Sequence, residues 1–187
     1  MQYEKLYSAI DKLLRGKSHI LLAIDGNSAA GKSTLAARLR SQYSCNLIHM
    51  DDFFLQPSQR TPQRLAEPGG NIDYERFSTE VLRPLRAGEP FSYRPYDCKT
   101  QSFAEPISVK PNALNIVEGV YSIHPLFASL YDLKVFMRID SEQQKTRLQE
   151  RGAELYKKFT DLWLPMENEY FKTFKTQESC DIVLEEG

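Results

Sequence analysis

The chain has 187 residues, 41% of them hydrophobic and 26% charged, and its formal net charge is −1 at pH 7. This length can bury a full core and favours one domain over two, and the composition excludes disordered and fibrous classes of protein. A net charge near zero argues against nucleic acid or a membrane surface as a general partner.

The cysteines and the first residues of the chain indicate its compartment. Cys45, Cys98 and Cys180 are odd in number and have no C-x-x-C spacing, so they predict reduced thiols rather than a disulfide framework or a zinc site. The chain starts with polar and acidic residues where a signal peptide needs an apolar stretch, and no run of residues is long enough to span a membrane. We therefore expect a cytoplasmic protein with a small-molecule substrate. The sequence leaves open whether the chain forms a homo-oligomer.

The first predicted element is an amphipathic helix over residues 2–15. Leu6, Ile10, Leu13 and Leu14 recur at helical spacing, and Gly16 is a fitting C-terminal cap. We expect this helix to pack on the domain as a structural element.

An apolar run over residues 19–25 predicts a buried strand, and a glycine-containing loop follows it directly. Segment 26–33 has the pattern G-x-x-x-x-G-K-S and precedes a helical pattern, which is the setting of a phosphate-binding P-loop. Its glycines let N–H groups turn inward, the Lys32 ammonium reaches the β- and γ-phosphates, and Ser33 offers its hydroxyl to Mg²⁺. The alternative is a turn that binds nothing. The expected nucleotide-binding residues are Gly26, Asn27, Ser28, Ala29, Ala30, Gly31, Lys32, Ser33 and Thr34.

Further apolar runs at 45–50, 113–118, 133–139 and 181–184 predict short buried strands, and helical segments lie between most of them. Strands that alternate with helices form a parallel sheet with helices on both faces. We therefore predict a three-layer α/β/α fold around a mostly parallel five-stranded sheet. Ligands in such folds bind beyond the carboxyl ends of the strands.

Two aspartates follow the second predicted strand at its carboxyl end. Asp51 and Asp52 stand where a phosphoryl-transfer enzyme needs a base for the acceptor hydroxyl, and Phe53 and Phe54 beside them can pack to fix their direction. We expect one of the two to be that base. The alternative is an aspartate-rich turn or helix cap, since both are common uses of aspartate.

Residues 51–112 are too long for a plain crossover and hold many of the prolines and glycines. Asp73 can cap a helix there, and Pro84 should end or kink this helix near Arg83. Segments 91–96 and 103–109 alternate well enough to predict a small β-hairpin or flap. Because long insertions at the functional edge tend to bind ligands, we expect an acceptor-binding segment at about 55–112.

Three more acidic residues end predicted strands. Glu118 is followed by Gly119, so its carboxylate leaves the sheet beside the expected P-loop, which suits a Mg²⁺ ligand acting directly or through water. A glutamate that simply faces solvent is the alternative. Asp25 and Asp140 compete for the metal, although Asp25 can instead brace the P-loop and Asp140 can cap the helix that begins at Ser141.

A predicted helix over 141–151 ends at Gly152, and it carries two arginines four residues apart. Arg147 and Arg151 on one face can close over ATP as a lid, at about 147–160, and stabilise charge on the transferring group. A solvated helix face, paired with Glu150, is the alternative. The three histidines have no metal-ligand spacing, and we expect them to be structural, with His49 alone near the site.

In their order along the chain, these motifs resemble the uridine kinase-like branch of P-loop kinases, whose relatives act on nicotinamide riboside, pantothenate and ribulose phosphate. The resemblance covers nearly everything after residue 18. The residues that carry it are 26–34, 50–54, 71–73, Pro90, Tyr93, 96–97, 116–119, 150–152 and 163–165.

The resemblance implies roles for individual residues. It implies that Asp51 is the base for a ribose 5′-hydroxyl, that Asp73 holds the ribose hydroxyls, and that Tyr93 or Tyr96 contacts a nucleobase. Phe54 is expected to line the same site, and Asp51 to join Ser33 and Glu118 around the metal.

The chain also departs from the family pattern. No histidine lies between His49 and His124 to contact the base, and Gln101 is the candidate replacement. Ala153 stands where the family has an arginine, and Lys157 or Lys158 can substitute for it as a point charge only.

We therefore predict a single P-loop kinase domain over 1–187 that uses ATP and Mg²⁺ to phosphorylate a hydroxyl of a nucleoside-like metabolite, as uridine/cytidine kinases do. The alternatives are a kinase for pantothenate, nicotinamide riboside or a sugar acid, and a nucleotide-binding regulatory module without catalysis. Asp51, Lys32, Arg147 and Arg151 are the expected catalytic residues.

Overall fold

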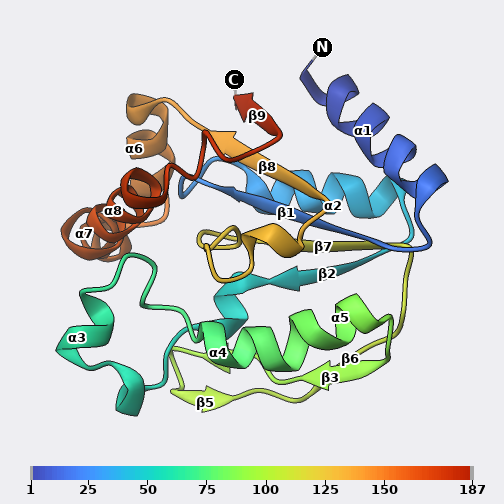
Figure 1. Ribbon diagram of the computed structural model, residues 1–187. Coiled ribbons are helices and arrows are strands. Elements are labelled where there is room, and N and C mark those ends of the chain that lie inside the picture. The colour runs from blue at the N-terminus through green and yellow to red at the C-terminus, as the bar shows by residue number, and fades with distance from the viewer. Residues whose placement is uncertain (1, 186–187) are drawn as a thin grey trace.

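The computed structural model describes residues 2–185 and arranges them around one five-stranded sheet (Figure 1). The strands lie in the order β2-β7-β1-β8-β9, and every neighbouring pair is parallel. Each matches a predicted strand to within one residue at either end, so these predictions are confirmed. Their bounds are β1 Ile20–Gly26, β2 Cys45–His49, β7 Leu114–Glu118, β8 Leu133–Arg138 and β9 Ile182–Glu185.

Helices cover both faces of this sheet, which confirms the three-layer α/β/α prediction (Figure 1). On one face, α1 (Gln2–Gly16) and α2 (Lys32–Gln42) pack with the even-numbered residues of β1. Leu6 and Ile10 of α1 are completely buried there, as the helical spacing predicts. The odd-numbered residues Leu21 and Ala23 face the opposite core, where α8 (Leu164–Phe174) contributes Tyr170. Alternating sides of β1 therefore serve two hydrophobic cores.

The long insertion after β2 contains one long helical stretch and one hairpin built from two short antiparallel ladders. The stretch runs through α4 (Tyr74–Phe77), a π-helical turn (Ser78–Leu82) and α5 (Arg83–Ala87). β3 (Phe91–Tyr93) pairs antiparallel with β6 (Ile107–Val109), and β4 (Tyr96–Asp97) pairs with β5 (Ser102–Phe103), which confirms the predicted flap. A short α3 (Pro62–Leu65) precedes these elements.

The helical stretch does not end near Arg83, but it departs from regular α-helical geometry directly before Pro84, so of the two expected outcomes, an end or a kink, only the end is wrong. The Arg83 N–H bonds to the Ser78 carbonyl five residues back, and this wide π turn lets the chain continue as α5 past Pro84. Wide turns of this kind relieve the clash and the missing N–H that proline brings to a regular helix. The stretch ends instead at Gly88, whose φ of 67° is left-handed.

After β8, the chain forms α6 (Ser141–Gln149), α7 (Ala153–Lys158) and a second π-helical turn (Phe159–Trp163), which leads into α8. In Figure 1 these helices gather beside the carboxyl ends of β1 and β8. Within residues 2–185, no helix has the length and apolar character needed to cross a membrane.

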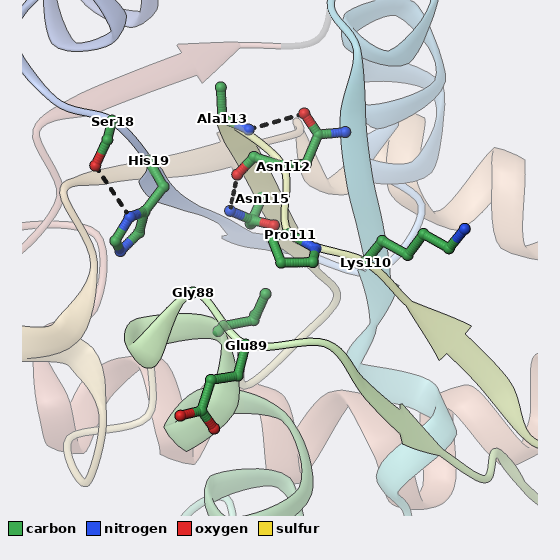
Figure 2. A pocket seen from close by; sticks show the side chains of 10 residues that line it. Ser18, His19, Gly88, Glu89, Lys110, Pro111, Asn112, Ala113 and Asn115 are labelled. Atoms are coloured by element: carbon green, nitrogen blue, oxygen red, sulfur yellow. Dashed lines mark hydrogen bonds between the residues drawn. The ribbon is translucent and has the colours of Figure 1, made fainter.

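A groove lies at the other edge of the sheet, where the strands begin (Figure 2). It encloses about 300 Å³ between His19 at the start of β1, the end of α5 and the segment that leads into β7. Its amides bond within the protein: Asn115 Nδ2 donates to the Asn112 carbonyl at 3.0 Å, and Asn112 Oδ1 accepts from the Ala113 N–H at 2.8 Å. Because it lies at the amino ends of the strands, the groove is separate from the carboxyl edge, where ligands of such sheets bind.

Candidate active site

The loop after β1 has the shape that the P-loop pattern predicts. Gly26 has a φ of 131°, and a Cβ atom at this position would lie 2.0 Å from the Met137 carbonyl oxygen, so only glycine fits. Gly31, with a φ of 81°, caps α2 without a side-chain hydrogen bond. The first N–H groups of α2 therefore face the loop, in an arrangement suited to a polyphosphate.

Lys32 lies at the centre of this site and is only 8% exposed. Its ammonium donates to the carbonyl oxygens of Gly26 and Asn27, each at 2.8 Å. Burial lowers the pKa of Lys32, and four carboxylates oppose this shift. In decreasing order of effect they are Glu167, Asp25, Glu118 and Asp51. The fold thus brings the predicted base and the P-loop lysine to one place.

Glu118 connects the P-loop to the neighbouring strand. The sheet register aligns it with Ile24 on β1 and with His49 on β2. Its Oε1 atom accepts from the Ser33 hydroxyl at 3.1 Å and lies 2.6 Å from His49 Nδ1. This hydrogen bond raises the pKa of His49.

The oxygens of Ser33 and Glu118 fit a hard cation such as Mg²⁺. Residues 2–185 contain no cluster of three or more His, Cys, Asp and Glu side chains that could hold a metal on their own. Mg²⁺ usually binds to one or two carboxylates and completes its shell with water and substrate phosphates, so this donor set suffices beside a bound nucleotide.

Asp51 and Asp52 lie in a 3₁₀ turn, Met50–Phe53, and point to different partners. Asp52 Oδ2 accepts from the Tyr93 hydroxyl at 3.1 Å, which ties it to the flap. Asp51 Oδ1 lies beside Gly119, 3.6 Å from where a Cβ would stand on that residue. Asp51 opens to solvent, yet protein encloses it on most sides, and this enclosure raises its pKa while the charge of Lys32 lowers it. Asp52 is therefore tied to the flap, and Asp51 is the one of the two whose pKa the charge of Lys32 lowers.

Asp25 is fully buried and braces the P-loop. Its Oδ1 accepts from the N–H groups of Gly26 and Tyr121 at 2.7 and 3.2 Å. Its Oδ2 accepts from the Ile123 N–H at 3.0 Å and the Tyr170 hydroxyl at 2.9 Å. Four donors occupy this carboxylate, which favours bracing over metal binding.

Asp140 caps α6, because its side chain accepts from the N–H groups of Glu142 and Gln143. The capping alternative is confirmed for this residue.

Asp73 joins the insertion to the turn that carries Asp51. Its N–H donates to the Phe53 carbonyl at 2.7 Å. Its Oδ1 caps α4 by accepting from the Arg76 N–H, and its Oδ2 accepts from Gln59 Nε2 at 2.8 Å. Arg76 also donates to the Asp52 carbonyl at 2.7 Å, so the predicted acceptor residue Asp73 and the turn that carries Asp51 form one unit.

The other predicted acceptor residues line the same region. Tyr93 packs on Phe53 with ring centroids 5.3 Å apart, and Phe54 forms a β-bridge with Ile72. Tyr96 is buried, and its hydroxyl has no hydrogen-bond partner within residues 2–185.

Gln101, the candidate replacement for a base-reading histidine, is exposed in the turn of the β4–β5 hairpin with a φ of 52°. The structure thus places Gln101 at the tip of this hairpin.

The two arginines predicted to share a helix face lie on either side of the end of α6. Arg147 donates to the Ala29 carbonyl of the P-loop at 3.1 Å. α6 ends at Gln149, so Arg151 lies in the following turn, with its guanidinium 5.5 Å from the centre of the Phe159 ring.

The two lysines considered as lid substitutes pair within their own helical segments. Lys157 bonds to Asp161, and Lys158 to Glu154 at 2.9 Å. All four side chains are mostly exposed, so these contacts add little to stability.

Sequence reasoning missed three residues of the site. Glu167 on α8 accepts from Ser28 of the P-loop, and Gln144 on α6 donates to the Ser28 carbonyl at 2.9 Å. Tyr121, two residues after Gly119, has a φ of 75°, a left-handed value that is rare for a bulky residue. The one signal in the sequence was Glu167, an acidic residue in the first turn of the otherwise aromatic α8. This signal does not identify its partner, Ser28, which is more than a hundred residues away.

His124 lies between two tyrosine rings that connect the insertion to α8. Its centroid is 5.1 Å from Tyr74 and 6.3 Å from Tyr170, and burial lowers its pKa to about 4. In the unfolded chain the histidine pKa is about 6.5, so the unfolded state binds more protons between these values. This contribution to stability is complete above pH 6.5 and is lost as the pH falls towards 4.

Replacing His124 by phenylalanine should therefore reduce the acid sensitivity of folding. The free energy of unfolding is measured by urea titration at pH 7 and at pH 4.5. Its decrease from pH 7 to pH 4.5 should be about 1–2 kcal/mol smaller in His124→Phe than in the native protein. Equal losses in both proteins would contradict a neutral, stacked histidine.

The chain is similar in sequence and in structure to known P-loop kinases. No protein-family profile matches the chain. The chain is 25% identical to a uridine kinase of Brevibacillus brevis over 186 residues, which cover 90% of this chain and 85% of the relative. A structure described as a possible uridine kinase from Bacillus stearothermophilus superposes with a TM-score of 0.68 at 23% identity, covering 96% of this chain and 99% of the other. Phosphoribulokinase from Rhodobacter spheroides superposes with a TM-score of 0.59 at 16% identity, covering 90% and 70%.

Proposed function

We propose that this chain, a kinase of the uridine kinase-like group of P-loop kinases, transfers the γ-phosphate of ATP to a hydroxyl of a nucleoside-like small molecule. One observation carries the proposal: at the carboxyl edge of the sheet, the P-loop residue Ser33 bonds to Glu118 at 3.1 Å, and Asp51 lies beside the next residue, Gly119. A phosphate site, a cation site and a base are the parts that phosphoryl transfer needs.

The nucleotide side of the reaction uses the loop over residues 26–34. Its amides and the Lys32 ammonium bind the phosphates, Ser33 and Glu118 hold Mg²⁺, and we assign Asp51 as a further ligand of the ion. When bound, the ion neutralises charge on the phosphates. Arg147 already contacts the loop, and Arg151 lies in the lid; both supply positive charge near the transferring group.

On the acceptor side, Asp51 takes the proton of the attacking hydroxyl. Asp52 is held by Tyr93, which leaves Asp51 as the carboxylate that faces the P-loop. Segment 55–112 binds the acceptor, because Asp73 is fastened to the turn that carries Asp51. Asp73, Tyr93, Tyr96 and Phe54 are the proposed contacts, and Gln59 yields its bond to Asp73 when a ribose diol binds.

An ADP-release assay with MgATP tests the function. The acceptors are uridine, cytidine, nicotinamide riboside, pantothenate and glycerate, and turnover is expected with a ribonucleoside. Asp73→Asn keeps the helix cap but loses the charge that binds the ribose hydroxyls, so the KM for the acceptor should rise about 10- to 100-fold. Asp97→Asn is the matched control, since Asp97 is an exposed flap residue that bonds to the nearby Lys99 N–H.

Each other outcome changes the proposal in a defined way. Turnover with pantothenate or glycerate and not with nucleosides would replace the acceptor class. Tight nucleotide binding with no acceptor-stimulated turnover would mean that the protein is a nucleotide-binding regulatory module and not a kinase. An unchanged acceptor KM in Asp73→Asn would remove Asp73 from the acceptor site.

A further inference from the structure

The tip of the P-loop is held by side chains from the other end of the chain. Gln144 on α6 donates to the Ser28 carbonyl at 2.9 Å, and Arg147 donates to the Ala29 carbonyl at 3.1 Å. Glu167 on α8 accepts from the Ser28 N–H at 3.2 Å and from the Ser28 hydroxyl. The two helices that flank the lid helix α7 therefore meet at Ser28, and α6 also contacts Ala29.

Ala29 explains why the tip needs outside support. Its φ of 65° is left-handed, a region that alanine adopts only under constraint. Such strain persists where surrounding contacts over-determine the backbone, and it is found at functional sites. The bonds to Ser28 and to the Ala29 carbonyl supply that constraint.

Glu167 is an unusual residue at its position. It is 5% exposed on a helix that otherwise buries aromatic rings such as Tyr170, and burial raises its pKa. A buried carboxylate costs more than a well-packed apolar side chain, so folding alone does not account for it. Glu167 is also the carboxylate with the largest effect on Lys32.

We propose that Glu167 is a positioning residue for the nucleotide: through Ser28 it fixes the tip of the P-loop in its binding shape and couples that loop to the lid. The inference rests on the proposed function, since a preformed loop serves to bind a nucleoside triphosphate. It adds that the lid-side helix α8, outside the P-loop motif, controls how tightly the nucleotide binds.

The expected effect is on binding rather than on the chemical step. Without Glu167 the P-loop adopts other conformations for part of the time. The apparent affinity for the nucleotide then falls in proportion to the population of the binding-competent conformation. Ground state and transition state lose equally, so KM for ATP rises while kcat stays within about twofold. A role confined to folding would lower the unfolding temperature and leave nucleotide affinity unchanged.

Calorimetry with the magnesium complex of AMP-PNP, an ATP analogue that is not hydrolysed, measures this without any acceptor. Glu167→Gln should weaken binding about tenfold and raise the KM for ATP by a similar factor. Glu169→Gln is the matched control, because Glu169 is exposed on the same helix and bonds only locally to Thr173, and it should bind as the native protein does.

Ser28→Ala, which removes the hydroxyl half of the contact, should weaken binding about threefold. The double variant should lose less than the product of the two single losses, because both act on one contact. Native-like affinity in Glu167→Gln, or fully multiplicative losses, would overturn the inference. If Glu167→Gln does not fold, native-like affinity in Ser28→Ala overturns it. Native protein that binds AMP-PNP but phosphorylates no acceptor would refute the proposed function and leave this inference standing.

Discussion

Replacing Asp51 by asparagine is expected to lower kcat about 10²- to 10⁴-fold, the usual contribution of a general base. The amide has the size of the carboxylate but cannot accept the proton of the attacking hydroxyl. Nucleotide affinity should change much less, because the P-loop amides and Lys32 carry it. Steady-state kinetics with the best acceptor from the panel measures kcat, and calorimetry with MgADP measures affinity.

Asp52→Asn is the matched control for this change. Asp52 has the same chemistry one residue away, but it accepts from the Tyr93 hydroxyl, so its replacement should cost less than tenfold. A larger loss in Asp52→Asn than in Asp51→Asn would exchange the two roles. An unchanged kcat in Asp51→Asn would mean that positioning alone drives the transfer.

The pH dependence of kcat/KM, which reports the ionisable groups of the free enzyme, gives the same test a second readout. A base works when deprotonated, so the rate falls as the pH drops through its pKa. Enclosure raises the pKa of Asp51, which moves this fall to higher pH than for an ordinary carboxyl group. In Asp51→Asn, the residual activity should no longer decrease as the pH drops through this range.

The elements of the fold could be predicted from the sequence because their signals are local. Each strand is a short apolar run, and the P-loop pattern lies in consecutive residues between β1 and α2. At Pro84 the sequence predicts an end or a kink of the helix, and the structure instead has a π turn over 78–82, after which the helical stretch continues. Local rules describe regular helices, and such a turn depends on packing around it.

The site was predictable only in part, because most of its contacts join residues far apart in the sequence. Asp25 stayed ambiguous since its donors lie at positions 26, 121, 123 and 170. Arg147 and Arg151 have helical spacing, but the helix ends between them. Glu167 carries no motif, and only the docking of α8 brings it to Ser28. The roles of the site residues themselves stay predictions.

Replacing Asp25 by asparagine should lower the free energy of unfolding by about 3 kcal/mol. An amide has one oxygen to accept hydrogen bonds, so at least one of the four buried donors around Asp25 loses its acceptor. The gain from removing a buried charge offsets part of this loss, since burial already raises the pKa of Asp25. Urea unfolding at pH 7, followed by the fluorescence of Trp163, measures the difference.

Tyr170→Phe sets the scale for that measurement, because it removes one of the four hydrogen bonds and keeps the ring contact with Tyr121. Its cost should be about 1–2 kcal/mol. The loss in Asp25→Asn should exceed it, because the amide disturbs N–H groups on both the P-loop and the turn after β7. Equal stability of Asp25→Asn and the native protein would mean that the burial cost of the charge cancels its hydrogen bonds. Asp25 would then be retained for the shape of the P-loop and not for the stability of the fold.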